Sequence, residues 1–171
     1  IPIRTNYILQ LHKEMYRFMD VTFGGKLKDT PNVIEDGDHN VLFTPLQPFE
    51  TPFALDNLCE QYDKAINEYG IDPLLVIPVF IHDFLCIHPF NDGNGRMSRL
   101  LTTLLLYKYG YTVGKYLSLE KKIQLTKSEY YEALSNSSKC WLTNENDDTP
   151  FVKYLLGTIL AAYRDFEDRI N

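Results

Sequence analysis

Residues 88–99 read HPFNDGNGRMSR and form a polar stretch between two apolar segments. The segment from Pro73 through Leu85 is apolar on nearly all sides, and the segment from Gly93 to Tyr109 is dense in leucine. Both patterns are typical of buried helices, and Gly110 follows the second one as a stop signal. The sequence therefore predicts a central pair of helices joined by a polar loop that opens the second helix.

Further helices are predicted on both sides of this pair. Apolar residues at helical spacing predict a helix over Thr5–Asp20, and an amphipathic pattern predicts a last helix over Thr149–Arg169. A helix from Thr51 to about Tyr69 is also expected. An N-cap residue followed by proline marks three of these helix starts, at residues 51–52, 72–73 and 149–150. Thr126-x-x-Glu129 matches a capping box ahead of a further helix.

Between residues 21 and 48 the pattern changes from helical to strand-like. Glycine and proline separate short β-prone pieces, residues 32–34 and 41–43, around an Asp36-Gly37-Asp38 turn. This is typical of a β-hairpin. We therefore expect a single all-α domain with one small hairpin inserted near the N-terminus.

Composition restricts the classes of function. The chain has 171 residues, 44% of them hydrophobic, and a net charge of −6, which favours a globular domain over a nucleic-acid binder. Three separated cysteines without a CxxC pair predict free thiols in a reducing, cytoplasmic compartment. No apolar run is long enough for a membrane span, so no membrane contact is expected. Because the chain begins at Ile1 with helical patterning, we expect a fragment of a longer chain.

The loop between the central helices has the residues of an anion site. Gly93 and Gly95 permit a backbone nest whose N–H groups converge on an anion, and the helix that begins there adds its positive end. Arg96 and Arg99 lie three residues apart and suit a polyphosphate. Their charges against Asp92 make the local balance +1. A dinucleotide-binding turn is excluded because Ser98 stands where the third glycine is needed. A P-loop is excluded as well, because the sequence contains no GxxxxGK[ST] pattern.

His88 and Asp92 are the candidates for catalysis in this loop. A carboxylate beside a phosphate nest is explained by Mg²⁺, which binds carboxylate and phosphate oxygens together. Asp92 as a simple helix cap remains an alternative. His88 can accept a proton near neutral pH, the requirement for a general base, although a histidine also often has a structural role. Phe90 is read as a core anchor of the loop. Spacing does not suggest a metal at the other histidines, which are His12, His39 and His82.

Residues 88–99 match every specified position of the motif HxFx[DE]GNGRxxR, and so the chain resembles the Fic (filamentation induced by cAMP) family. The early hairpin, the helical body and the pattern Tyr130-Tyr131-x-x-Leu134 extend the resemblance over nearly the whole chain. It implies the Fic fold, a helical bundle around the motif-bearing helix pair with the hairpin as a flap. It also implies a protein adenylyltransferase, which transfers AMP from ATP to a Ser, Thr or Tyr hydroxyl of a target protein or of itself.

The resemblance assigns a role to each motif residue. His88 would deprotonate the acceptor hydroxyl, and Asp92 would hold Mg²⁺ on the α and β phosphates. Arg96 and Arg99 would neutralise the β and γ phosphates, and Phe90 would pack underneath. The phosphates would be cradled by the three residues Gly93, Asn94 and Gly95.

The resemblance also implies roles outside the motif. The flap, residues 24–48, would align the target segment by strand addition. Tyr130 matches a tyrosine near the adenine in relatives, with Asn136 or Ser138 assisting. The groove for nucleotide and target would be lined by four flap residues, Asn32, Val33, Ile34 and Glu35.

Two features of the family bear on the reaction and its control. Gly95 stands where phosphorylating relatives have lysine, which favours nucleotidyl transfer. The family's inhibitory pattern [ST]xxxE[GN] is not found, because the one Glu followed by Gly or Asn, Glu145, has Trp141 four residues before it. Any inhibitory helix would lie upstream of Ile1 or on a partner chain and contact Arg99. A homodimer, and delivery into a host cell as an effector, are left open.

Three alternatives to protein adenylyl transfer remain open. Within the enzymes, these are removal of AMP and transfer of another nucleotide or a phosphocholine group. From another class, the domain could be a catalytically silent nucleotide-sensing or protein-binding module. The presence of His88 argues against the silent module, since a pure binder has no use for a base.

Overall fold

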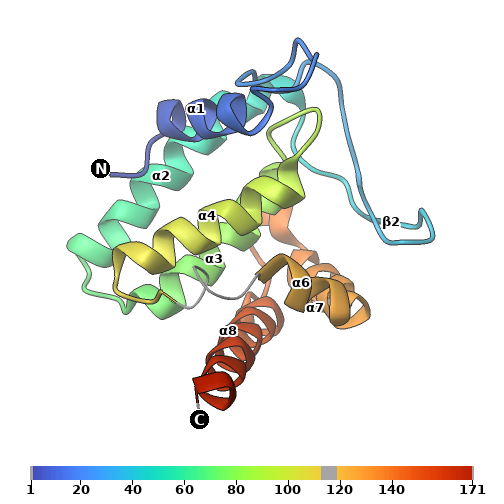
Figure 1. The fold of residues 1–171 in the computed structure, drawn as a ribbon. Coiled ribbons are helices and arrows are strands. Elements are labelled where there is room, and N and C mark those ends of the chain that lie inside the picture. The colour runs from blue at the N-terminus through green and yellow to red at the C-terminus, as the bar shows by residue number, and fades with distance from the viewer. Residues whose placement is uncertain (1, 113–118, 171) are drawn as a thin grey trace.

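The computed structural model describes residues 2–112 and 119–170, which are mostly helical with one small hairpin (Figure 1). This confirms the all-α prediction with an inserted hairpin. The elements follow in the order α1 (Thr5–Met15), β1 (Ile34–Glu35), β2 (Val41–Phe43), the short 3₁₀ helix η1 (Pro48–Glu50), α2 (Thr51–Asn67), α3 (Pro73–Ile87), α4 (Asn94–Lys108), α6 (Leu119–Leu125), α7 (Lys127–Ser138), the 3₁₀ helix η2 (Trp141–Thr143) and α8 (Thr149–Ile170).

Helix α3 is the centre of the fold. It packs against α2, α4 and α8, so most of its apolar residues are buried, as the sequence predicts. Its start is capped by Asp72, whose carboxylate accepts a hydrogen bond of 2.9 Å from the Leu74 amide. Its last residue, Ile87, is followed directly by His88, so the core of the domain positions the polar loop.

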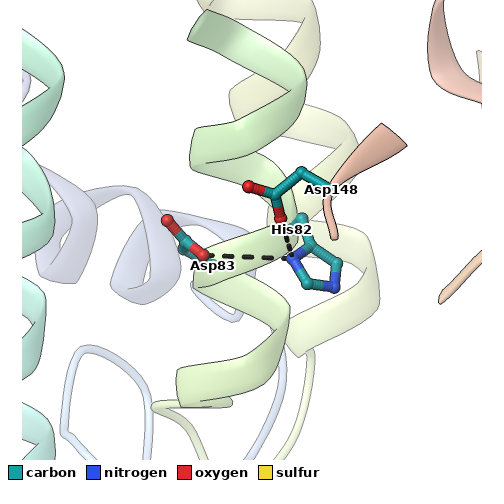
Figure 2. Close-up of side chains that lie close together, drawn as sticks. All are labelled: His82, Asp83 and Asp148. Carbon is teal, nitrogen blue, oxygen red and sulfur yellow. Dashed lines mark ion pairs between the residues drawn. The ribbon is translucent and has the colours of Figure 1, made fainter. Parts of the chain in front are cut away.

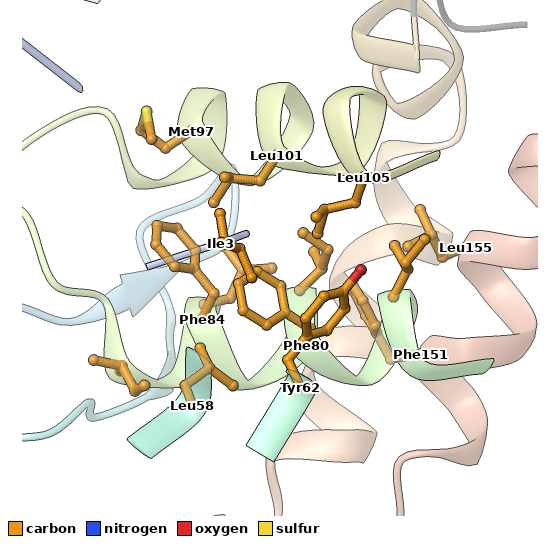
Figure 3. Packing of buried hydrophobic residues seen from close by; sticks show 14 of the residues in the cluster. Ile3, Leu58, Tyr62, Phe80, Phe84, Met97, Leu101, Leu105, Phe151 and Leu155 are labelled. Carbon is orange, nitrogen blue, oxygen red and sulfur yellow. The ribbon is translucent and has the colours of Figure 1, made fainter. Parts of the chain in front are cut away.

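Large side chains from several helices fill the core around α3 (Figure 3). Phe80 and Phe84 of α3 meet Met97 and Leu101 of α4, and Phe151 of α8 closes the other end. All five are at most 2% exposed. Each such side chain contributes about 1.5–3 kcal/mol by leaving water, so apolar burial holds the α3–α4 pair in place.

The helix ends differ from the sequence predictions where local hydrogen bonds intervene. The first helix ends at Met15 rather than Asp20, because the chain turns there and the Tyr16 side chain enters the polar loop. Thr126 does not form a capping box, since its hydroxyl donates to the Lys122 carbonyl of α6, a helix that the sequence analysis did not predict. Similarly, Thr51 donates to Pro48 as part of a preceding 3₁₀ turn, and Asp147 rather than Thr149 accepts the N-terminal amide of α8.

The hairpin consists of the antiparallel pair β1 and β2, with Ile34 opposite Phe43. The Asp36 carboxylate closes the turn by accepting hydrogen bonds from the Asp38 and Asn40 amides at 2.8 and 3.0 Å. The first strand begins two residues later than predicted, because the Asn32 side chain bonds to the polar loop instead of continuing the ladder. The flap is thereby attached to the loop at its base.

Within residues 2–112 and 119–170, none of the helices combines the length and the apolarity that crossing a bilayer requires.

Candidate active site

His88 lies at the C-cap of α3 in the left-handed region, with φ 51° and ψ 60°. Its Nδ1–H donates to the Leu85 carbonyl at 3.2 Å, so the lone pair resides on Nε2. Burial and, to a smaller extent, the nearby charge of Lys28 lower the pKa of His88 to about 4. The imidazole is therefore neutral at physiological pH, and Nε2 is available to accept a proton.

The loop after His88 is closed by the side chain of Asn94. This side chain is 4% exposed, accepts a hydrogen bond from the Phe90 amide at 2.9 Å, and donates to the Phe90 carbonyl at 2.8 Å. Gly93 completes the turn with φ 85°, a value that L-residues rarely adopt. The Asn94 side chain is thus fully engaged within the loop, and only its backbone could contribute to the phosphate cradle predicted from the sequence.

The N-terminus of α4 provides backbone donors at the predicted nest. The first intrahelical hydrogen bond runs from the Met97 amide to the Gly93 carbonyl at 2.8 Å, so the amides of residues 94–96 precede the helical ladder. Such a helix start favours an anion. Gly95 lies against the Arg99 side chain, since a Cβ there would be 2.9 Å from the Arg99 Nη1 atom.

The Asp92 side chain is hydrogen-bonded on one side and exposed to solvent on the other. Its Oδ2 accepts from the Tyr16 hydroxyl at 2.6 Å and from Arg96 Nη2 at 3.3 Å, while 61% of the side chain is exposed. Gly93, and not Asp92, is the N-cap of α4, and no side-chain cap bond is formed there. The alternative that Asp92 merely caps this helix is therefore wrong. An exposed carboxylate beside a helix N-terminus fits Mg²⁺, a hard cation that binds one or two carboxylates and retains water.

Helix α1 contributes residues that the sequence analysis missed. His12 is fully buried; its Nδ1 accepts from the Gly25 amide and its Nε2–H donates to the Asp92 carbonyl, both at 2.9 Å. Its ring stacks on Phe90 with centroids 3.8 Å apart and planes within 2°. Phe90 is itself fully buried. No motif spacing links residues 12–16 to residues 90–92, so only the tertiary fold shows that α1 supports the loop.

The base of the flap binds the other side of the loop. The Lys28 amide donates to the Pro89 carbonyl at 2.7 Å, and its buried Nζ donates to Asn32 Oδ1 at 2.8 Å. Asn32 in turn donates to the carbonyls of His88 and Phe90, at 3.2 and 3.1 Å. Burial lowers the pKa of Lys28 to about 8. Asn32 therefore positions the loop backbone, whatever further contacts it makes with a ligand.

The other three flap residues predicted to line the groove differ in how exposed their side chains are. Val33 is 40% exposed, whereas Ile34 is 6% exposed and belongs to the core. Glu35 lies on the surface and pairs with His39 at 3.0 Å. Of the predicted groove residues, Val33 and Glu35 thus have side chains available to a ligand.

Arg99 is engaged by a residue of the helix that was not predicted. Its Nε and Nη2 donate to the two carboxylate oxygens of Glu120, at 2.6 and 2.9 Å. The Glu120 carboxylate holds the guanidinium in a fixed plane, and hydrogen bonding to Arg99 lowers the pKa of Glu120. Tyr130 is buried beside Arg99, and burial raises its pKa to about 12. The expectation of an inhibitory contact from upstream or from a partner chain stays a prediction.

Ser138 and Asn136 lie away from this loop. Ser138 is buried against His82 of α3, and Asn136 accepts from Lys139 at 3.4 Å at the end of α7. The structure therefore brings together His88, the loop 90–96 and Arg99 with Tyr130, while Ser138 belongs to a separate cluster.

Comparison with known proteins agrees with the motif. A model of the Fic/DOC family matches residues 2–106, which contain all of the polar loop. The chain belongs to the Fic/DOC family. The resemblance inferred from residues 88–99 is thereby confirmed.

Individual relatives of the family show how far the likeness extends. Over 150 residues the chain is 29% identical to the protein adenylyltransferase fic-1 of Caenorhabditis briggsae, covering 86% of this chain and 25% of that protein. It is equally identical over 150 residues to a Fido domain-containing protein of Dictyostelium discoideum, covering 85% of this chain and 92% of the relative. The chain thus spans about a quarter of the adenylyltransferases it matches.

The fold of a solved Fic family protein superposes on nearly the whole chain. The crystal structure of this protein, from Desulfovibrio desulfuricans G20, matches with a TM-score of 0.80 at 27% identity, covering 96% of this chain and 47% of the other. The predicted Fic fold is confirmed.

The turn at Gly93 should tolerate no side chain. A Cβ there would lie 2.6 Å from the Tyr16 hydroxyl oxygen at φ 85°, whereas Gly110 has φ 87° with open space around it. We expect Gly110→Ala to cost about 1–2 kcal/mol of unfolding free energy from backbone strain alone. Gly93→Ala should cost about 3 kcal/mol or more, because the clash is added to the strain. Urea unfolding of both variants measures the difference, and equal losses would contradict the close contact.

Stability should fall on acidification because of the buried histidines. Burial lowers the pKa of His12 and His88 below 6.5, so just below that pH the unfolded chain binds more protons than the folded chain. Acidification therefore favours the unfolded chain. The free energy of unfolding should be nearly constant between about pH 6.5 and 8 and decline by about 1–2 kcal/mol down to pH 5. Urea titrations at several pH values measure it. His88→Ala should flatten the slope, while the exposed control His39→Asn should keep it; a flat wild-type profile would refute the account.

Proposed function

We propose that this domain transfers AMP from ATP to a hydroxyl side chain of a target protein or of itself. The observation that carries the proposal is the state of His88, neutral with its lone pair on Nε2, at the edge of an anion-binding helix start. A general base needs this protonation state, and a phosphate binder alone does not. The name protein adenylyltransferase carried by several relatives supports the same activity.

The proposed reaction is a single displacement at phosphorus. His88 Nε2 takes the proton of the acceptor hydroxyl as its oxygen attacks the α-phosphorus, and the bond between that phosphorus and the α–β bridging oxygen breaks. AMP is then joined to the side chain and pyrophosphate leaves. Since Nδ1–H is already committed to the Leu85 carbonyl, the imidazolium formed has each N–H directed to a defined place.

Phosphate binding is assigned to the helix start and the two arginines. The amides of residues 94–96 and the side chains of Arg96 and Arg99 would hold the phosphates by charge-assisted hydrogen bonds. Asp92 would hold Mg²⁺, which when bound neutralises phosphate charge. Tyr16 and His12 keep the Asp92 carboxylate and backbone in place for this purpose.

The flap is the proposed docking site for the target. Its strands are short and form a two-stranded sheet, and Val41 of β2 is 59% exposed. An extended peptide could add to this sheet by backbone hydrogen bonds, and Lys28 and Asn32 connect the flap base to the loop that ends α3. The acceptor hydroxyl would in this way be delivered toward His88.

Of the alternatives, removal of AMP needs a carboxylate that can orient a water molecule. Glu120 is the acidic residue at Arg99, but both of its oxygens accept hydrogen bonds from that guanidinium. This geometry favours transfer over removal.

The catalytic role of His88 is tested with ATP labelled at the α-phosphate. Wild-type protein with Mg²⁺ should label itself or a target, and His88→Ala should lose about 10²–10⁴-fold in rate, the usual contribution of a general base. Circular dichroism and ATP titration verify that the variant folds and binds. Equal labelling by the variant would exclude His88 as the base. Label from the γ-phosphate and none from the α-phosphate would instead mean phosphorylation.

Glu120 should compete with ATP for Arg99. We expect Glu120→Gln to raise the affinity for Mg-ATP several-fold, because the neutral amide releases the guanidinium and removes a negative charge near the phosphates. Arg99→Ala should lower it by about 1.5–3 kcal/mol. Titration calorimetry measures both, with Glu129→Gln on the exposed surface of α7 as control. If Glu120→Gln weakens binding as much as Arg99→Ala, Glu120 orients Arg99 for the nucleotide and does not compete with it.

A further inference from the structure

A second cluster of ionisable groups lies beside α3, outside the polar loop. His82 and Asp83 belong to α3, and Asp148 comes from the segment before α8 (Figure 2). One ligand atom from each of the three lies within 4.8 Å of the others. His82 is fully buried, while the side chains of Asp83 and Asp148 are 30% and 33% exposed. Both carboxylates therefore face solvent on one side and the imidazole on the other.

Hydrogen bonds around His82 determine which ring nitrogen carries its proton. The Ser138 hydroxyl donates its one hydrogen to the Leu134 carbonyl at 2.6 Å, so toward His82 it can only accept. His82 Nε2 lies 3.2 Å from this oxygen and is therefore the protonated nitrogen. Cys86 lies 3.6 Å from the same nitrogen and 3.5 Å from the Ser138 oxygen, to which its thiol can donate.

The other ring nitrogen has no hydrogen-bond partner among the described residues. His82 Nδ1 is buried and directs its lone pair toward two carboxylates, at 3.2 Å from Asp148 Oδ1 and 3.9 Å from Asp83 Oδ1. These three electronegative atoms converge on one point, where only a positive charge between them makes the arrangement favourable. A bound cation would supply that charge and give the buried Nδ1 a partner.

The distances suit a first-row transition metal. Ligand atoms about 2.0–2.2 Å from Zn²⁺ in tetrahedral geometry are about 3.4 Å apart, and the separations of 3.2 and 3.9 Å lie on either side of that value. The surroundings also match a metal centre, since His82 Nε2–H donates to Ser138 and Asp83 Oδ1 accepts from Trp141 Nε1 at 2.9 Å. Such second contacts orient metal ligands. An imidazole ligand distinguishes the site from one built for Mg²⁺ or Ca²⁺, which prefer oxygen.

We propose that His82 Nδ1, Asp83 and Asp148 bind a divalent transition metal of the zinc type, with water completing the coordination. The site is separate from Asp92, and it does not depend on the proposed function. It connects α3, whose C-cap is His88, to the segment before α8, so its role is a structural clip on that helix. His82 lies six residues before His88 on this helix.

Zinc titration of the metal-stripped chain tests the proposal. Isothermal calorimetry with ZnCl₂ should show one site, and excess Zn²⁺ should raise the midpoint of thermal unfolding, because the metal binds the folded chain. Asp148→Asn should weaken Zn²⁺ binding by at least tenfold and abolish the thermal shift. The matched control is Asp147→Asn, a neighbouring surface carboxylate that caps α8 at Thr149 and should bind like wild type.

Two further measurements keep the test decisive. Asp83→Asn should also weaken binding at least tenfold, since its amide oxygen can still accept from Trp141 and the fold is retained. The spectrum of the Co²⁺-substituted chain should lack a thiolate charge-transfer band, because Cys86 and the exposed Cys140 are not among the ligands. The proposal is overturned if no zinc binds, if Asp148→Asn binds like wild type, or if cobalt shows thiolate ligation.

Discussion

The buried imidazole of His12 is the contact on which the geometry of the loop depends. Its two nitrogens join the Gly25 amide to the Asp92 carbonyl, and its face covers Phe90. Three segments separated by up to 80 residues are thereby held by one ring. Because one nitrogen accepts and the other donates, only the neutral tautomer fits, and the burial that lowers its pKa keeps it in that form. The hydrogen bond to its carbonyl fixes the backbone of Asp92, and thereby the place from which its exposed carboxylate projects.

The sequence allowed the central helix pair and the loop to be predicted, since their signals are local. An apolar run, a capping Asp72 and the glycines between two helices each act within a few residues. What supports the loop was not predictable in this way. His12, Tyr16 and Lys28 have no spacing that relates them to residues 87–92, and only the packing of α1 and the flap base on α3 brings them there.

The short helix α6 shows a different limit of the sequence analysis. It has seven residues and is polar at most positions, so periodicity is a weak signal for it. Its two buried residues, Leu119 and Ile123, are four apart and anchor it to the core. The same anchoring places Glu120 against Arg99, a contact that links α4 to α6. The residue that engages the second motif arginine was therefore found only through the tertiary structure.

Both arginines of the loop are paired with carboxylates in the structure, so the local charge is lower than the sequence alone indicates. Counted along residues 88–99, the loop has a balance of +1, but Glu120 makes the balance around the loop neutral. Arg96 is paired with Asp92 at 3.3 Å and Arg99 with Glu120 at 2.6 Å, so neither guanidinium is an uncompensated charge. A polyphosphate therefore gains little from long-range attraction in a chain of net charge −6. Under the proposed function, a divalent cation at Asp92 occupies the carboxylate and releases Arg96, so cation and nucleotide should bind in a linked manner. The backbone amides of α4, which no carboxylate can neutralise, then supply the part of the attraction that is always present.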